Sequence, residues 1–164
     1  MSAGGRTIWW SDRTLHVAAA LSLLAAIIHL WVMPEHFEEW WGYGTFFLVV
    51  ALAQGLYALC LLRRAGRPRL LFGVVGNLTI VILWLVTRTS GIPLLGPHAG
   101  EVEEVGALDL FCTLAEVCVV SGLGALAMKH LVTESRIQVV VVVLGVSALL
   151  FWHLLHLLAG SSAH

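Results

Sequence analysis

The chain has 164 residues, of which 59% are hydrophobic and only 12% are charged, and its formal net charge at pH 7 is −1. Together with a mean hydropathy of +0.92, this composition excludes an ordinary soluble domain and predicts a membrane protein. The one dense basic segment, RRAGRPR at 63–69, is short and better explained by membrane topology, so we expect no nucleic acid among the partners.

Long apolar stretches predict helices that cross a membrane. A bilayer core about 30 Å thick requires roughly 17–25 helical residues. Five stretches reach this length, at about residues 14–33, 43–62, 70–87, 107–128 and 137–158. Helices are expected because a lone strand cannot satisfy its own backbone in lipid. The sequence therefore predicts one all-α domain over 1–164, an integral membrane bundle with about five transmembrane helices and an uncleaved first span.

The segment PEHFEEWW at 34–41 follows the first span. Met33 precedes a proline and is biased away from helical geometry, whereas Pro34 suits the first turn of a new helix. One face of this helix would carry Phe37, Trp40 and Trp41, and the other Glu35, Glu38 and Glu39. The pattern predicts a short amphipathic helix at the outer membrane surface, with its tryptophans in the interfacial belt.

Basic residues indicate the cytoplasmic side of a membrane protein. The predicted spans place eight of the nine on one side, namely Arg6, Arg13, Arg63, Arg64, Arg67, Arg69, Lys129 and Arg136. Only Arg88 lies on the other side, where glutamates gather. We therefore expect a cytoplasmic N-terminus and an external C-terminus.

The histidines gather at the predicted outer end, where five of the eight lie: His29, His36, His98, His153 and His156. His29 and His153 have matching depth, about 22–24 Å from the inner ends of their spans at 1.5 Å per residue. For any single histidine of this set, a position at the membrane interface is a sufficient explanation. As a set beside carboxylates they favour a metal site, because imidazole is the commonest metal ligand.

We predict metal ligation by His29, His36, His153 and His156, with Glu35 and Glu39 orienting the imidazole rings. Copper is slightly favoured over zinc or iron, because Met33 lies one turn after His29. Haem b with His29 and His153 as axial ligands is the alternative cofactor.

The acidic and amide side chains inside the predicted spans are Gln54, Asn77, Asp109 and Glu116. The depths of Gln54, Asn77 and Glu116 converge near the membrane midplane, where an ionisable group is costly and suggests a function. Glu116 is either a protonated structural group hydrogen-bonded to Gln54 or Asn77, or part of a proton relay, a metal site or a quinone-type pocket. The cysteines are interpreted as packing residues.

The segment RTSGIPLLGPHAGEVEEVG at 88–106 is long for a connection in so small a protein. Its apolar centre predicts that it folds back over the helices as a lid. Arg88 needs an acidic partner at this end, and we expect an ion pair with Glu101 or Glu103; Glu104 and Asp109 are further candidates.

The pieces PEHFEEWWGYGTFF, GNLTIVILWLVTRTSGIP and GPHAGEVEEVGALDL resemble those of small multi-span membrane proteins of actinobacteria and related bacteria. The resemblance covers roughly residues 29–110. It implies a multi-span helical fold and a bacterial plasma-membrane location. That family is uncharacterised, so the resemblance implies no activity.

These observations predict a metal-binding or redox protein with a histidine and carboxylate site at the outer face of the lipid bilayer, serving a periplasmic or membrane protein. A b-type haem electron carrier, with or without a link to quinone, is the second hypothesis. A non-catalytic accessory subunit of a membrane complex is the third.

The topology leads to a direct test. A reporter fused after His164 should be active outside the cell, because five spans and a cytoplasmic N-terminus place the C-terminus there. Activity in the cytoplasm would mean that one span has been miscounted, and the short third stretch is the first to re-examine.

Overall fold

The computed structural model describes residues 4–63, 66–92 and 96–129, and this part of the chain is all-α. It forms four helices, α1 (Gly4–Glu39), α2 (Trp41–Arg63), α3 (Arg67–Thr89) and α4 (Ala107–Lys129). All four contain a stretch long and apolar enough to cross a membrane. The predicted fifth span, 137–158, lies outside the described residues.

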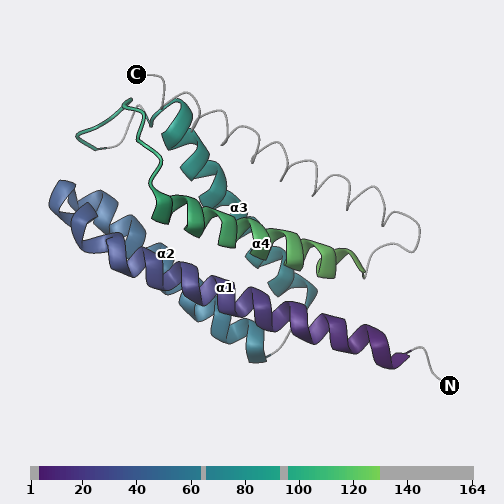
Figure 1. Ribbon diagram of the computed structural model, residues 1–164. Helices are drawn as coiled ribbons and strands as arrows, with labels where there is room; N and C mark the ends of the chain where they lie inside the picture. The colour runs from purple at the N-terminus through teal and green to yellow at the C-terminus, as the bar shows by residue number, and fades with distance from the viewer. Residues whose placement is uncertain (1–3, 64–65, 93–95, 130–164) are drawn as a thin grey trace.

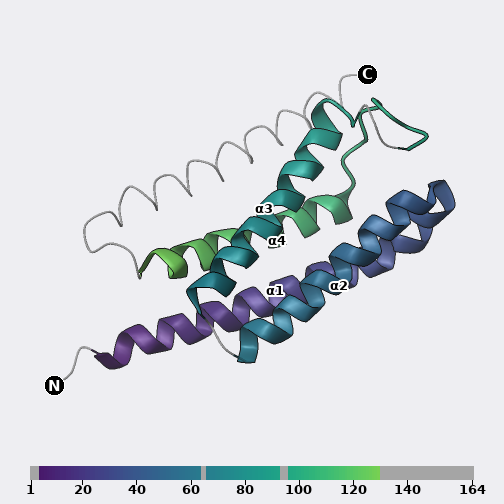
Figure 2. The same ribbon diagram turned by 180° about the vertical axis from the view of Figure 1, so that it is seen from behind.

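Helix α1 is the central element of the arrangement. It packs against α2 as an antiparallel hairpin and also against α4, while α3 packs against α4 (Figure 1). The turn between α1 and α2 lies at the same end of the molecule as the connection between α3 and α4 (Figure 2). Two segments far apart in sequence, around residues 40 and 100, are thereby brought to one end.

The start of α3 follows from its sequence. Gly66 is extended, with φ −123°, and Pro68 occupies the first turn of the helix. A proline costs little there because the first N–H groups of a helix have no partner within it. The backbone N–H of Arg69 donates to the Gly66 carbonyl at 2.9 Å.

The end of α1 differs from the sequence prediction. No new helix begins at Pro34; α1 continues through this proline to Glu39. Pro34 removes one helical hydrogen bond, but contacts with α2 hold the last turns. The His36 ring stacks on Phe47 with centroids 4.0 Å apart, and the Phe37 ring lies where a side chain at Gly44 would stand.

Polar and apolar side chains are distributed as expected for helices in lipid. Large apolar side chains point outward, among them Trp31 at 79% exposed, Leu56 at 63% and Phe72 at 69%. Polar side chains are buried between the helices, among them Ser22, Gln54, Asn77 and Glu116. The described helices are thus compatible with a multi-pass membrane protein, whose backbone is satisfied internally.

A close helix contact occurs at Gly73 on α3. The Tyr57 hydroxyl of α2 donates to the Arg69 carbonyl at 3.1 Å, which places its ring beside Gly73. A Cβ added at Gly73 would overlap this hydroxyl and would lie 2.8 Å from Leu123 Cδ1. A Cβ added at Gly76 would meet nothing within 4 Å.

We expect Gly73→Ala to lower the free energy of unfolding in detergent by about 1–3 kcal/mol, because an added methyl group in a well-packed contact displaces its neighbours. Gly76→Ala is the matched control on the same helix. It should be neutral or stabilise by up to about 1 kcal/mol, because alanine is the better helix former. Equal effects of the two changes, measured by unfolding in detergent, would contradict this packing.

Candidate metal centre

Each of the four helices contributes one buried polar side chain to a common group. These are His29 of α1, Gln54 of α2, Asn77 of α3 and Glu116 of α4, which are 7%, 4%, 3% and 1% exposed. Gln54 Nε2 donates to Glu116 Oε1 at 2.8 Å and to Asn77 Oδ1 at 3.3 Å. The hydrogen bond expected between Glu116 and Gln54 is therefore present.

The backbone around this group explains how it is held. Ser22, two turns before His29 on α1, donates to the Gln54 carbonyl at 3.0 Å and so ties α1 to α2. Ala25 and Ile28 of α1 pack against Cys112 of α4. The small side chains of Ala25 and Cys112 let α1 approach α4 closely, and His29 then lies beside the face of α4 that bears Glu116.

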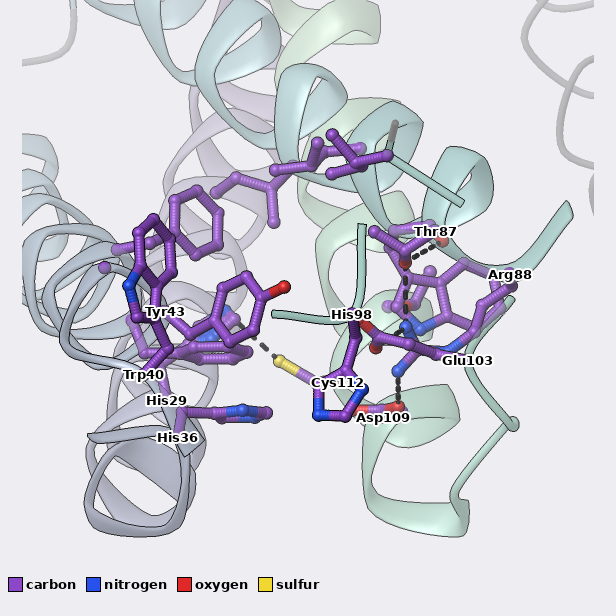
Figure 3. Close-up of a pocket in the computed structure, with 18 of the residues that line it drawn as sticks. His29, His36, Trp40, Tyr43, Thr87, Arg88, His98, Glu103, Asp109 and Cys112 are labelled. Carbon is purple, nitrogen blue, oxygen red and sulfur yellow. Dashed lines mark hydrogen bonds and ion pairs between the residues drawn. The ribbon is translucent and has the colours of Figure 1, made fainter. Parts of the chain in front are cut away.

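Three side chains at the α1–α4 contact form a set of possible metal ligands, which we call the donor triad: His29, Cys112 and Glu116. All three are buried, and one ligand atom from each lies within 4.8 Å of the other two. His29 Nε2 lies 3.3 Å from Glu116 Oε1 and 3.7 Å from Cys112 Sγ (Figure 3).

These separations fit the edges of a coordination tetrahedron. With Zn–N near 2.05 Å, Zn–S near 2.3 Å and Zn–O near 2.1 Å, a tetrahedral site separates N from O by about 3.4 Å and N from S by about 3.6 Å. The 3.3 Å between His29 and Glu116 is also long for a nitrogen–oxygen hydrogen bond, whose usual length is about 2.9 Å. Two of the three separations within the donor triad therefore agree with a tetrahedral site, and the third, between Cys112 and Glu116, is within 4.8 Å.

A cavity of about 210 Å³ adjoins the donor triad. All three side chains of the triad line it, and its lining continues to His98, Glu101 and Glu103 in the connection between α3 and α4. This part of the connection therefore lies against the same cavity as the donor triad, whereas residues 93–95, in the apolar centre on which the predicted lid depends, lie outside the described residues.

Arg88 holds this connection in place. Its guanidinium forms ion pairs with Glu103 of the connection and with Asp109 in the first turn of α4 (Figure 3). The Arg88 side chain is 9% exposed, whereas Glu103 is 49% and Asp109 32% exposed, so each ion pair lies at the edge of the buried interior with its carboxylate partly in solvent. The pairing expected with Glu103 is present, but Glu101 instead pairs with His98, whose Nδ1 lies 2.9 Å away.

Of the predicted histidine ligands, the structure places only His29 in the donor triad. His36 lines the same cavity, but its Nδ1 pairs with Glu39 at 3.1 Å and its ring stacks on Phe47. Glu39 thus orients a histidine ring as expected, whereas Glu35 is exposed on α1. His153 and His156 lie outside the described residues.

Sequence reasoning missed Cys112 as a candidate ligand, because a single buried cysteine is usually a packing residue. A signal for it was nevertheless present. Asp109, Cys112 and Glu116 are spaced by three and four residues, and this spacing puts all three on one face of a helix. The thiol had to be considered together with its helical neighbours rather than with the other cysteines.

No protein-family model matches the chain, and neither a curated protein nor a solved structure matches it.

Two substitutions separate the packing of Glu116 from its polar contacts. Glu116→Gln should retain the fold, because the amide oxygen can still accept from Gln54. Glu116→Leu should lower the free energy of unfolding by about 1–3 kcal/mol, because it strands the buried Gln54 donor. Thermal or denaturant unfolding in detergent measures both. Equal tolerance of the two changes would show that this hydrogen bond contributes nothing to stability.

Proposed function

We propose that this chain is an integral membrane protein that binds one transition-metal ion through His29, Cys112 and Glu116, between α1 and α4. The observation that carries the proposal is the pair of separations from His29 Nε2, 3.3 Å to Glu116 and 3.7 Å to Cys112, which match a tetrahedral site. A nitrogen, a sulfur and an oxygen ligand buried at one point are a chemically suitable set for such an ion.

Charge balance favours a divalent ion. A cysteine bound to a metal is a thiolate, and Glu116 would bind as a carboxylate. Together with the neutral His29 they form a ligand set with two negative charges. A divalent ion neutralises this set in a low-dielectric interior, where a net charge is costly. Zinc accepts all three ligand types at the observed spacing. We therefore propose zinc in preference to copper. The sequence alone favours copper, because Met33 lies one turn after His29.

The surroundings support a site that interacts with further molecules. Three protein ligands leave a fourth tetrahedral position, as in catalytic rather than structural zinc sites. Gln54 donates to Glu116 Oε1 and is itself held by Asn77. Such contacts orient the ligating carboxylate and so affect how tightly it binds the metal.

The depth of the site indicates which side it serves. His29 lies ten residues before the end of α1, about 15 Å along the helix axis. With the N-terminus cytoplasmic, as the basic residues predict, this is the outer half of a bacterial plasma membrane. The metal would then serve chemistry or a protein partner on the external side.

We expect the purified protein to bind one equivalent of zinc or cobalt, measured by elemental analysis after dialysis. His29→Ala, Cys112→Ser and Glu116→Gln should each weaken binding by about 10- to 100-fold or more, since each change affects a ligand atom directly. His16→Ala and Cys118→Ser are the matched controls. Both residues are exposed, and Cys118 lies on the same helix as Cys112.

The affinity should fall as the pH is lowered, because each ligand must lose its proton before it binds the metal. Unchanged metal content in all three triad variants would contradict the proposal, and the triad would then be a hydrogen-bonded structural group. The haem hypothesis requires His153, which lies outside the described residues; a Soret band in the absorption spectrum would select it instead.

A further inference from the structure

The cavity beside the donor triad has a mostly apolar wall. Its large lining side chains include Trp40, Tyr43, Phe46, Phe47, Leu83 and Trp84. Trp40 and Tyr43 lie on the side of the cavity occupied by His29 and His36, whereas Arg88, Glu103 and Asp109 lie on the other side, with Cys112 between them (Figure 3).

The charged groups that line this cavity are engaged with one another. Arg88 pairs with Glu103 and Asp109, His98 with Glu101, and His36 with Glu39 of the same helix. Two lining donors, Trp84 Nε1 and Arg88 Nε, are buried without a hydrogen-bond partner among the described residues, so they could bind one small polar group of an occupant. An apolar molecule needs no such partners and gains free energy by leaving water.

The volume is compatible with a small occupant. An enclosed apolar cavity of about 150 Å³ takes up benzene, so the 210 Å³ found here has room for one ring with a small head group. All three residues of the donor triad line the cavity, so an occupant would lie beside the atoms that would bind the metal.

Resting on the proposed function, we propose that this cavity binds a small single-ring apolar molecule whose nitrogen or oxygen head group coordinates the metal. The aromatic wall contacts the ring, and the metal is the polar anchor. The substrate class of the site is therefore a compact aromatic or alicyclic compound with one donor atom, rather than a sugar, a phosphate or a peptide.

The experiment compares two probes on the cobalt-loaded protein in detergent, imidazole and 4-phenylimidazole. Both offer the same nitrogen, and only the second carries an apolar ring. Coordination changes the visible spectrum of the cobalt ion. We expect 4-phenylimidazole to bind at least about 10-fold more tightly, because its ring loses its contact with water.

Two variants of α3 localise the effect. Ile80 lines the cavity, so Ile80→Trp should fill part of it and abolish the preference for 4-phenylimidazole while leaving the cobalt content unchanged. Ile82 is 52% exposed on the same helix, so Ile82→Trp should keep the preference. Because detergent takes up the probe equally for all variants, it cannot produce a difference between them.

The outcomes separate the two proposals. Stoichiometric cobalt binding without a preference for 4-phenylimidazole, or a preference that Ile80→Trp leaves intact, would overturn the cavity assignment and leave the metal site standing. Failure to bind cobalt would overturn both. The cobalt content of Ile80→Trp also reports its fold, because the donor triad forms only when α1 and α4 pack together.

Discussion

The buried carboxyl group of Glu116 is the constraint on which the rest of this structure depends. It is 1% exposed in the middle of a helix that is apolar enough to cross a membrane. A polar group at such a depth must find its partners inside the protein. Gln54 and His29 supply them from two other helices, and Asn77 holds Gln54 from a fourth. One side chain thus sets the relative positions of all the described helices.

The apolar surroundings of Glu116 also explain why its hydrogen-bonded side chains are a suitable set of ligands for a metal ion. In a medium of low dielectric constant, attraction between opposite charges is strong and an unpaired charge is costly. A carboxyl group, a thiol and an imidazole whose ligand atoms lie within 4.8 Å of one another could either share protons or lose them to solvent in exchange for a cation. Neither state would require a different fold.

The connection between α3 and α4 is coupled to the site through α4. Arg88 binds Glu103 of the connection and Asp109 of the helix, and Asp109 lies one turn before Cys112. The ion pairs therefore fix both the covering segment and the first turns of the helix that bears two residues of the donor triad.

The sequence by itself determined that the described chain is helical, where its long apolar stretches lie, and that Glu116, Gln54 and Asn77 have similar depths. Depth follows directly from residue number, because every helical residue advances by a constant rise. The sequence also determined that Arg88 would need an acidic side chain as its partner at the same end of the helices. Only the tertiary structure decided which side chains at one depth meet, because that depends on the rotation of each helix and on its neighbours. The contact between α1 and α4 made Cys112, rather than His36, the partner of His29, and packing against α2 carried α1 through Pro34.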